Sequence, residues 1–201
     1  MKPTLFNTDM KSIRFPPPTA DEEIRAILAN RKTATRRAVK EPYYIDDAEA
    51  SRVSGLAIHR GTRMTDGMPY PHQPYRPGDI LYVRETWARS MSGSYLYRAT
   101  DMPIICDRWR PSIHMPREAA RIFLRVTAVR VERLQDITED GAIKEGCTAH
   151  GGNLALDEFE AVWHSTLKLA DRILYGWGAN PWVWVIEFER ISKEEAMRYG
   201  N

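Results

Sequence analysis

The chain lacks a long apolar run: none of its 201 residues lies in a stretch approaching the roughly 20 apolar residues that cross a bilayer. The first residues, Met1–Asn7, also lack the apolar core of a secretory signal peptide. These absences argue against a membrane-spanning helix and against secretion. We therefore expect a cytoplasmic protein that has no membrane partner.

Cysteine is scarce as well. The two cysteines, Cys106 and Cys147, form no CxxC pair, and the five histidines show neither HxxxH nor HxH spacing. Zinc sites need such clustered ligands, and a protein that is not secreted keeps its thiols reduced. We therefore expect no disulfide, no metal site and no cofactor.

Hydrophobic residues make up 43% of the chain and charged residues 28%, which is typical of a globular domain. The length fits one domain, 1–201, with an insertion at about 41–75 and an extra helix at about 156–170. The net charge is only +2, but seven arginines lie in 108–133 and seven acids in 136–160. Such asymmetry suits an anionic ligand better than a membrane.

The first predicted helix follows Pro16–Pro18, which hold residues 8–18 in an extended, loop-like form. Thr19 and Glu22 have the spacing of a capping box. Apolar residues at i, i+3 and i+4 then form one stripe on a helix of about three turns. Asn30 is a suitable left-handed end for this helix.

Alternating apolar residues predict five strands: Leu5–Asn7, Ile80–Ala88, Tyr95–Ala99, Ile122–Val131 and Trp182–Ile191. Between the last two, Thr138 caps a helix that ends at Gly146, and a second helix covers 156–170. Residues 41–77 are a long excursion, with a helical stretch near 46–54. This order favours an α+β fold, a mixed or antiparallel β-barrel with flanking helices.

Alternation also assigns side chains to faces of these strands. Even-numbered residues of 122–128 and of 182–188 share a face of their strands, and in Ile80–Ala88 the odd-numbered residues do so. If the odd-numbered face is internal, Glu85 is a carboxylate among apolar neighbours beside Trp87. The alternative is that the opposite face is the internal one.

Residues 31–40 carry five cations and no acid. Like charges placed so closely repel one another, so a phosphate-bearing partner is the simplest source of compensation. A solvated basic turn is the alternative, because short runs of lysine and arginine are common.

Lys32 and Thr35 are the chemically interesting pair in this basic segment. A threonine hydroxyl becomes a nucleophile when a base removes its proton, and a lysine serves as that base when its pKa is lowered. Arg31, Arg36 and Arg37 are positively charged neighbours, and such neighbours lower the pKa of a lysine. Because residues three apart point to opposite faces of a straight strand, the pair requires a turn near Thr33–Ala34. Alternatively, Lys32 caps the preceding helix.

Glu145 lies in the last turn of a predicted helix, where an acid opposes the helix dipole. Either it pairs with a cation from elsewhere, for which Lys32 is suitable, or it is a solvated surface residue.

The segment Trp109–Arg117 mixes aromatic, hydroxyl, imidazole and guanidinium groups, carried by Trp109, Arg110, Ser112, His114 and Arg117. Bases stack on aromatic rings while cations contact phosphates, so this mixture suits single-stranded nucleic acid or nucleotides. An ordered loop whose Trp109 packs on the core is the alternative.

Ala29–Arg37 resembles the GRKTxTxR signature of ASCH domains, with Asn30 where glycine is usual. Three further segments resemble motifs of this family: Arg76–Leu81, Asp136–Gly146 and Trp182–Ile191. Two more, Val83–Trp87 and Trp109–Arg117, resemble segments of its larger, prophage-encoded members. Together these motifs span most of residues 1–191.

The resemblance implies a PUA-like β-barrel, a fold used mainly for RNA. Some small ASCH proteins are amidohydrolases that remove the acetyl group from acetylcytidine, others are described as ribonucleases, and many are linked to RNA binding alone. In the amidohydrolases a lysine and a threonine of the signature and a glutamate of the later helix are catalytic. The matching residues are Lys32, Thr35 and Glu145, in a chain that is far longer than those enzymes.

The leading hypothesis is an ASCH protein that binds RNA, or a nucleoside or nucleotide, in a basic cleft that includes Arg31 and Arg36. Thr35 attacks an acyl carbon or orients a water, Lys32 is the general base and Glu145 holds Lys32. Three other residues assist: Arg37 offsets the charge of the oxyanion, and Glu85 and Trp87 contact the nucleobase of the ligand. A non-catalytic RNA-binding module is the rival and a ribonuclease the weaker one. The sequence leaves the oligomeric state open.

Overall fold

The computed structural model describes residues 10–39, 74–101, 108–149, 151–152 and 154–199, together with the backbone of 43–44 and 58–59. The predicted strand Leu5–Asn7 and the predicted helical stretch near 46–54 lie outside these residues. So does most of the predicted insertion at 41–75, apart from the short strands β3 (Tyr43–Tyr44) and β4 (Ile58–His59), which pair with each other.

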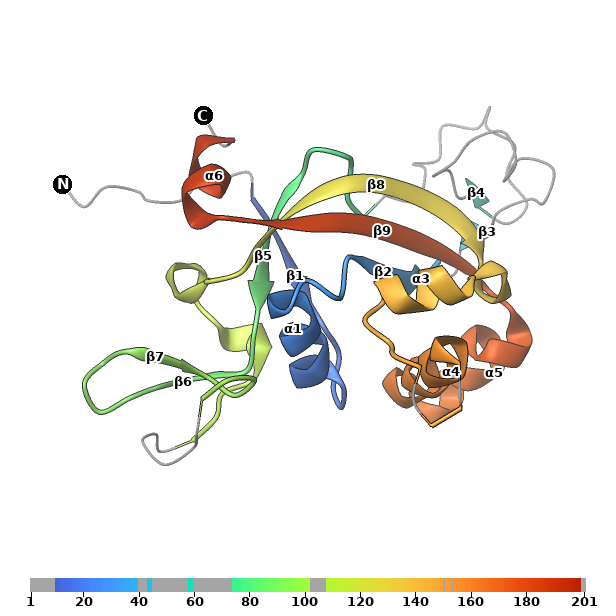
Figure 1. Cartoon of the computed structure of the whole chain (residues 1–201), viewed down its shortest axis with the longest axis horizontal. Coiled ribbons are helices and arrows are strands. Elements are labelled where there is room, and N and C mark those ends of the chain that lie inside the picture. The colour runs from blue at the N-terminus through green and yellow to red at the C-terminus, as the bar shows by residue number, and fades with distance from the viewer. Residues whose placement is uncertain are drawn as a thin grey trace.

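The main sheet has five strands in the order β1-β5-β8-β9-β2. β1 (Lys11–Arg14) is parallel to β5 (Ile80–Arg84), and the other pairs are antiparallel. Two long strands, β8 (Phe123–Arg133) and β9 (Trp182–Ile191), cross the molecule side by side, and β2 (Ala34–Ala38) lies at the far edge (Figure 1). The predicted α+β class with a mixed sheet and flanking helices is confirmed. Among the described residues β1 and β2 are not paired, so closure into a barrel remains a prediction.

The long strand β9 has the predicted bounds and is buried on both faces. Trp184, Ile186 and Phe188 join one hydrophobic cluster, and Val183 and Val185 join another. In β8 the alternation predicted through residue 128 is interrupted, because the register with β9 shifts between Val126 and Ala128. Such a bulge leaves one residue of a strand unpaired and moves the apolar face by one position; beyond it Val129 is the buried residue.

Helix α1 (Ala20–Leu28) packs on the first cluster and ends as predicted, with Asn30 at a φ of 56°. The predicted capping box does not form: the Thr19 hydroxyl donates to Glu23 at 2.9 Å rather than accepting from the helix backbone. The N-terminal β1 is a further difference, since residues 8–18 were expected to be loop-like. Pairing with β5 provides the backbone hydrogen bonds that a loop would lack.

The helices between β8 and β9 in the chain lie on the same side of these strands as α1 (Figure 1). α3 (Glu139–Lys144) begins at the predicted Thr138 cap, whose hydroxyl accepts from Gly141 at 3.1 Å. α4 (Ala155–Thr166) is shorter than predicted, because the hydroxyls of Ser165 and Thr166 donate to carbonyls three residues earlier. α5 (Arg172–Tyr175) and α6 (Lys193–Arg198) follow, and short 3₁₀ turns cover 112–114, 117–119, 134–136, 169–171 and 177–179.

The predicted strand Ile80–Ala88 is divided at Glu85 into β5 and β6 (Trp87–Arg89), and β6 forms a hairpin with β7 (Tyr95–Tyr97). Glu85 is only 2% exposed, so the predicted internal face is the internal one. In the part of the chain that the structure describes, no helix is long and apolar enough to span a membrane.

Candidate functional site

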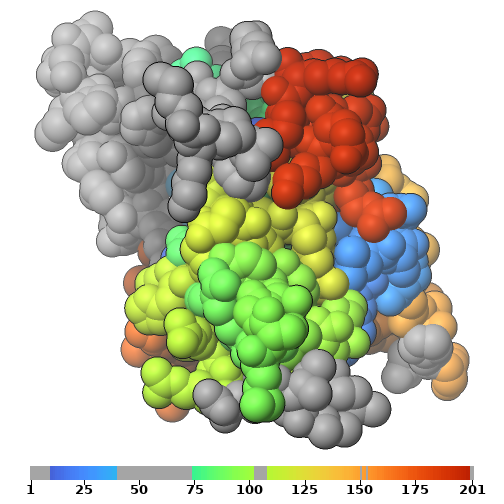
Figure 2. All heavy atoms as spheres, turned by 90° about the vertical axis from the view of Figure 1, so that its left-hand side faces the viewer, coloured from blue at the N-terminus to red at the C-terminus, as the bar shows by residue number. Residues whose placement is uncertain are grey.

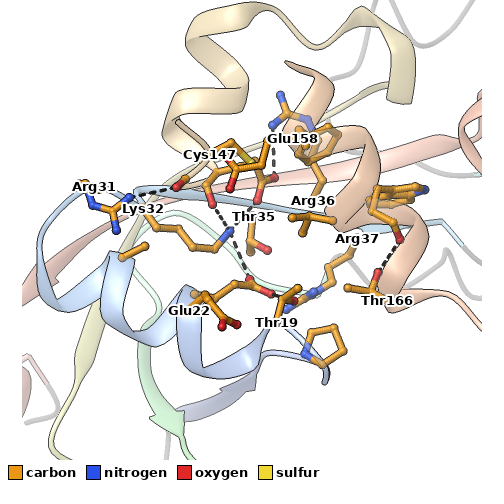
Figure 3. Close-up of a pocket in the computed structure, with 18 of the residues that line it drawn as sticks. Thr19, Glu22, Arg31, Lys32, Thr35, Arg36, Arg37, Cys147, Glu158 and Thr166 are labelled. Atoms are coloured by element: carbon orange, nitrogen blue, oxygen red, sulfur yellow. Dashed lines mark hydrogen bonds and ion pairs between the residues drawn. The ribbon is translucent and has the colours of Figure 1, made fainter. Parts of the chain in front are cut away.

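A pocket of about 440 Å³ lies between α1, β2, the end of α3 and α4 (Figure 3). Its lining comes from segments that are far apart in the sequence. It includes six of the residues predicted to form the site: Arg31, Lys32, Thr35, Arg36, Arg37 and Glu145. A pocket of this volume suits a small organic ligand.

Lys32 is 3% exposed and its amine is at the centre of this pocket. The amine donates to the Glu145 carbonyl at 2.7 Å and to Glu145 Oε2 at 2.6 Å. Oε2 of Glu23, from α1, is 3.4 Å away. Lys32 therefore does not use its side chain to cap the preceding helix; instead the backbone N–H groups of Arg31 and Lys32 both donate to Ala26 and close that helix.

The turn that Lys32 and Thr35 require is present at Thr33–Ala34. The Thr33 N–H donates to the Lys144 carbonyl, the Thr33 carbonyl accepts from Phe188, and β2 begins at Ala34. The change from loop to strand directs both side chains into one pocket (Figure 3). Thr35 is 2% exposed, so water reaches its hydroxyl chiefly through the pocket.

Glu145 is buried, not solvated, and both of its carboxylate oxygens are engaged. Oε2 pairs with Lys32, and Oε1 accepts from Arg36 Nη1 at 3.3 Å. Arg36 in turn donates to Glu132 at 3.0 and 2.6 Å. A charged group buried in this way needs such partners, and the network fixes the carboxylate that orients the lysine.

Gly146 permits the close approach of this helix end to α1. Its φ is 96°, and an added Cβ would lie 3.1 Å from the Ala26 side chain and 3.2 Å from the Lys32 side chain. Glycine adopts this left-handed conformation without steric cost, so it positions Glu145 over Lys32.

Two of the three arginines that were expected to surround the lysine amine donate to backbone carbonyls. Arg31 donates to the Gly146 carbonyl, and Arg37 donates to the Arg14 carbonyl. The amine is instead flanked by the carboxylates of Glu145 and Glu23. The activation of Lys32 by cations stays a prediction, and the groups that contact the amine and can accept its proton are these two carboxylates.

The predicted basic cleft is a pocket of mixed charge. Four cations line it, but so do the four carboxylates Glu22, Glu23, Glu145 and Glu158. The formal charges of the lining cancel. A ligand with little net charge is therefore a better match for this pocket than a polyanion.

One side of the pocket is apolar and is provided by α4, whose Phe159 and Trp163 line it. The Arg36 guanidinium carbon lies 5.7 Å from the centroid of the Phe159 ring, and the Trp163 indole N–H donates to the Tyr175 carbonyl at 2.8 Å. Both aromatics belong to the predicted extra helix, and the sequence analysis did not place them in the site. Helical spacing reports a buried face but not whether a cavity adjoins it.

Cys147 also lines the pocket. Burial, with Glu158 as a smaller contribution, raises the pKa of its thiol to about 12. A thiolate is the reactive form of cysteine, so at neutral pH Cys147 acts as a small apolar side chain.

The other predicted site residues lie outside this pocket: Glu85, Trp87, Trp109, Arg110, Ser112, His114 and Arg117. Glu85 forms a bidentate pair with Arg121 at 3.0 and 2.7 Å, and burial raises the pKa of this carboxyl although Arg121 opposes the shift. Trp87 is 4% exposed and packs against Tyr95. Glu85 and Trp87 therefore do not line the pocket that holds Lys32, and their contact with a nucleobase stays a prediction.

The segment around 109–117 gathers instead beside the β6–β7 hairpin. Arg110 exchanges two backbone hydrogen bonds with Trp87, and its guanidinium carbon lies 5.2 Å from the centroid of the Trp87 ring. Ser112 and His114 lie in a 3₁₀ turn, and Arg117 lies over the Tyr82 ring at 5.5 Å. Trp109 is half-buried. The residues predicted to bind one ligand thus fall into two separate groups.

No family model and no curated protein matches the chain. A solved protein from Enterococcus faecalis, of the DUF984 family model, is similar with a TM-score of 0.45 and 12% identity over 91% of this chain and 80% of that one. An ASCH domain from Lactobacillus crispatus is similar with a TM-score of 0.39 and 14% identity, over 92% and 82% respectively. The second belongs to the family whose motifs the sequence resembles.

Proposed function

We propose that the pocket binds a nucleoside whose base carries an N-acyl group, and that Lys32, Thr35 and Glu145 hydrolyse the amide. The observation that carries this proposal is the ion pair between Lys32 and Glu145, 113 residues apart and 2.6 Å from each other, in a pocket that Thr35 also lines. An amine, a hydroxyl and a carboxylate around one cavity are the groups that nucleophilic acyl transfer uses.

The lining supports a nucleoside more than a polynucleotide as the ligand of this pocket. Its volume of about 440 Å³ is that of a small-molecule site. Phe159 and Trp163 offer aromatic surface to a base, and the carboxylates and cations beside them offer hydrogen-bond acceptors and donors. The cancelling charges give no general attraction for a phosphate backbone.

The chemistry follows from the contacts of the lysine. Two carboxylates contact the Lys32 amine, and Glu23 is the one that Arg36 does not hold. Once Lys32 has given a proton to Glu23, its neutral amine takes the Thr35 proton as Thr35 Oγ1 bonds to the acyl carbon. As the carbon–nitrogen bond breaks, the Lys32 ammonium returns this proton to the leaving nitrogen, which departs as the neutral amino group of the nucleobase. A water then attacks the acyl–Thr35 ester and gives a proton to Lys32, the acid leaves, and Lys32 returns the proton to Thr35 Oγ1. Arg37, at the pocket wall, offsets the oxyanion charge.

The test is to incubate the pure protein with acetylcytidine and related N-acyl nucleosides and to measure the deacylated product by chromatography. Wild-type protein should release product, and Lys32→Ala should lose about 100-fold or more of the rate, which is the usual contribution of a general base. Equal release by both proteins, or release by neither, contradicts the proposal.

The alternative candidate is a binding module without catalysis. The observation in its favour is that two carboxylates already hold the Lys32 amine, so the pair is satisfied without any reaction. In that case Lys32→Arg, which keeps the charge, should bind nucleosides as wild type does. An enzyme with the same substitution would lose its base, since a guanidinium does not give up its proton at neutral pH.

A further inference from the structure

A second basic region of the molecule is built around the β6–β7 hairpin. We call it the hairpin surface and define it by Arg89, Tyr95, Trp87, Arg108 and Arg110. Figure 2 faces this side of the molecule, where the hairpin projects toward the viewer with the segment after residue 108 beside it. None of these residues lines the pocket.

Two arginines of the hairpin surface are stacked on aromatic rings. Arg89 lies 4.5 Å from the Tyr95 ring centroid, and its Nη2 donates to the Tyr95 hydroxyl at 2.8 Å. Arg110 lies over Trp87, and the Trp87 and Tyr95 ring centroids are 5.7 Å apart. The two stacks are therefore neighbours.

The backbone holds these stacks in place. Arg89 pairs with Tyr95 across the hairpin, and Arg110 is joined to Trp87 by hydrogen bonds of 2.7 and 3.1 Å. A binding group that is already ordered loses less entropy when a ligand arrives. The hairpin surface is thus pre-organised to present two guanidinium planes.

The arginines of this region differ in how their charge is compensated. Arg121 is paired with Glu85, and Arg98 with Asp21. Arg89, Arg108 and Arg110 are exposed, and among the described residues none of the three forms an ion pair with a carboxylate. The Glu118 carboxylate lies nearby and accepts from the Tyr95 hydroxyl at 3.3 Å, but in the described part of the chain it pairs with none of these arginines. Three such cations on one protrusion attract a polyanion.

Stacked guanidinium groups indicate what kind of polyanion fits. Arg89 and Arg110 are exposed, and bases stack on guanidinium planes as they do on aromatic rings. Arg89 already donates to the Gly93 carbonyl and the Tyr95 hydroxyl, so its remaining N–H groups and those of Arg110 are the donors for phosphate oxygens. In a single strand the bases are free to stack in this way, whereas in a duplex they are already paired.

We propose that the hairpin surface binds single-stranded nucleic acid, with phosphates on Arg89, Arg108 and Arg110 and bases on the two stacks. The site is separate from the pocket and does not depend on the hydrolysis proposed there. It gives the chain a means of holding a polynucleotide that the mixed-charge pocket lacks.

The experiment measures fluorescence anisotropy of labelled RNA and DNA single strands of roughly ten nucleotides, without self-complementarity, bound to the full chain. Arg89→Ala/Arg110→Ala should weaken binding about tenfold or more, the loss expected when stacking is removed. The slope of log affinity against log salt should fall by about 0.7 for each arginine removed. A preference for RNA over DNA would mean that the 2′-hydroxyl is also read.

Two controls separate this result from general effects of charge or misfolding. Arg190→Ala removes an exposed arginine of β9, outside the hairpin surface, and should change affinity little. Arg89→Lys keeps the charge and should keep the wild-type salt slope. The proposal is overturned if the double variant binds as wild type does, if Arg190→Ala weakens binding equally, or if Arg89→Lys loses as much slope as the alanine variant. Lys32→Ala should bind the strands normally even if nucleoside hydrolysis is never detected.

Discussion

The pocket and the hairpin surface both contain several arginines, yet these side chains are compensated in different ways. In the pocket, buried Arg36 is satisfied by Glu132 and Glu145 within the chain. On the hairpin surface, Arg89 and Arg110 are exposed and stack on rings without a carboxylate among the described residues. A buried guanidinium needs an internal partner, whereas an exposed one is stable in water and remains available to a ligand. Burial, rather than residue type, therefore separates the positioning arginine from the ligand-binding ones.

The largest expected difference is between removing a buried and an exposed arginine. Arg36→Ala should lower the free energy of unfolding by about 3 kcal/mol, because Glu145 and Glu132 lose a buried cation and keep only Lys32 and Arg130 as partners. Arg110→Ala should lower it by less than about 1 kcal/mol, the value of an exposed stacked pair. Urea denaturation of both variants measures this. Equal losses would mean that the buried network is not stronger than the exposed stack.

The two regions also differ at their left-handed glycines. Gly146 in the pocket and Gly93 in the hairpin turn have φ of 96° and 84°, but an added Cβ meets close neighbours only at Gly146. Gly93→Ala should cost about 1 kcal/mol from backbone strain alone, and Gly146→Ala about 1–2 kcal/mol more. Gly146→Ala should also slow nucleoside hydrolysis, since it displaces Glu145 from Lys32. If both variants unfold at the same urea concentration, the close packing at Gly146 is not important.

A smaller, pH-dependent effect is expected near the base of the hairpin. Burial raises the folded-state pKa of the Glu85 carboxyl above its ordinary value of 4.5. The folded state then binds this proton more tightly than the unfolded state does, so the contribution is fully present below pH 4.5 and is lost as the pH rises through the folded pKa. The stability of wild type relative to Glu85→Gln should therefore fall with rising pH in this range. Urea titrations at a series of pH values measure it; a rise would contradict the raised pKa.

Local patterns in the sequence were sufficient for several parts of this fold. The apolar alternation of 182–191 predicted the bounds of β9. Thr138 and Gly146 predicted where α3 begins and ends, and Asn30 predicted the end of α1. These features depend on a few neighbouring residues, so their spacing carries the information. The bulge in β8 and the early end of α4 depend on cross-strand register and on side-chain hydrogen bonds, which spacing alone does not reveal.

The site was predictable only in part for the same reason. The signature and the helix end identified Lys32, Thr35 and Glu145, which the structure brings to one pocket. Glu23, Phe159 and Trp163 arrive there from α1 and α4, and no local pattern distinguishes a pocket residue from a core or surface one. Likewise, Glu85 was expected to contact a ligand, but its partner is Arg121, 36 residues further along the chain.

The central claim is that Thr35 is the nucleophile of an amide-hydrolysing pocket. Its most direct test is the rate of acetylcytidine deacylation by Thr35→Val and Thr35→Ser. Valine keeps the shape and removes the hydroxyl, so activity should fall by about 100-fold or more, whereas serine keeps the hydroxyl and should retain most of it. Deacylation by Thr35→Val at the wild-type rate would contradict the claim.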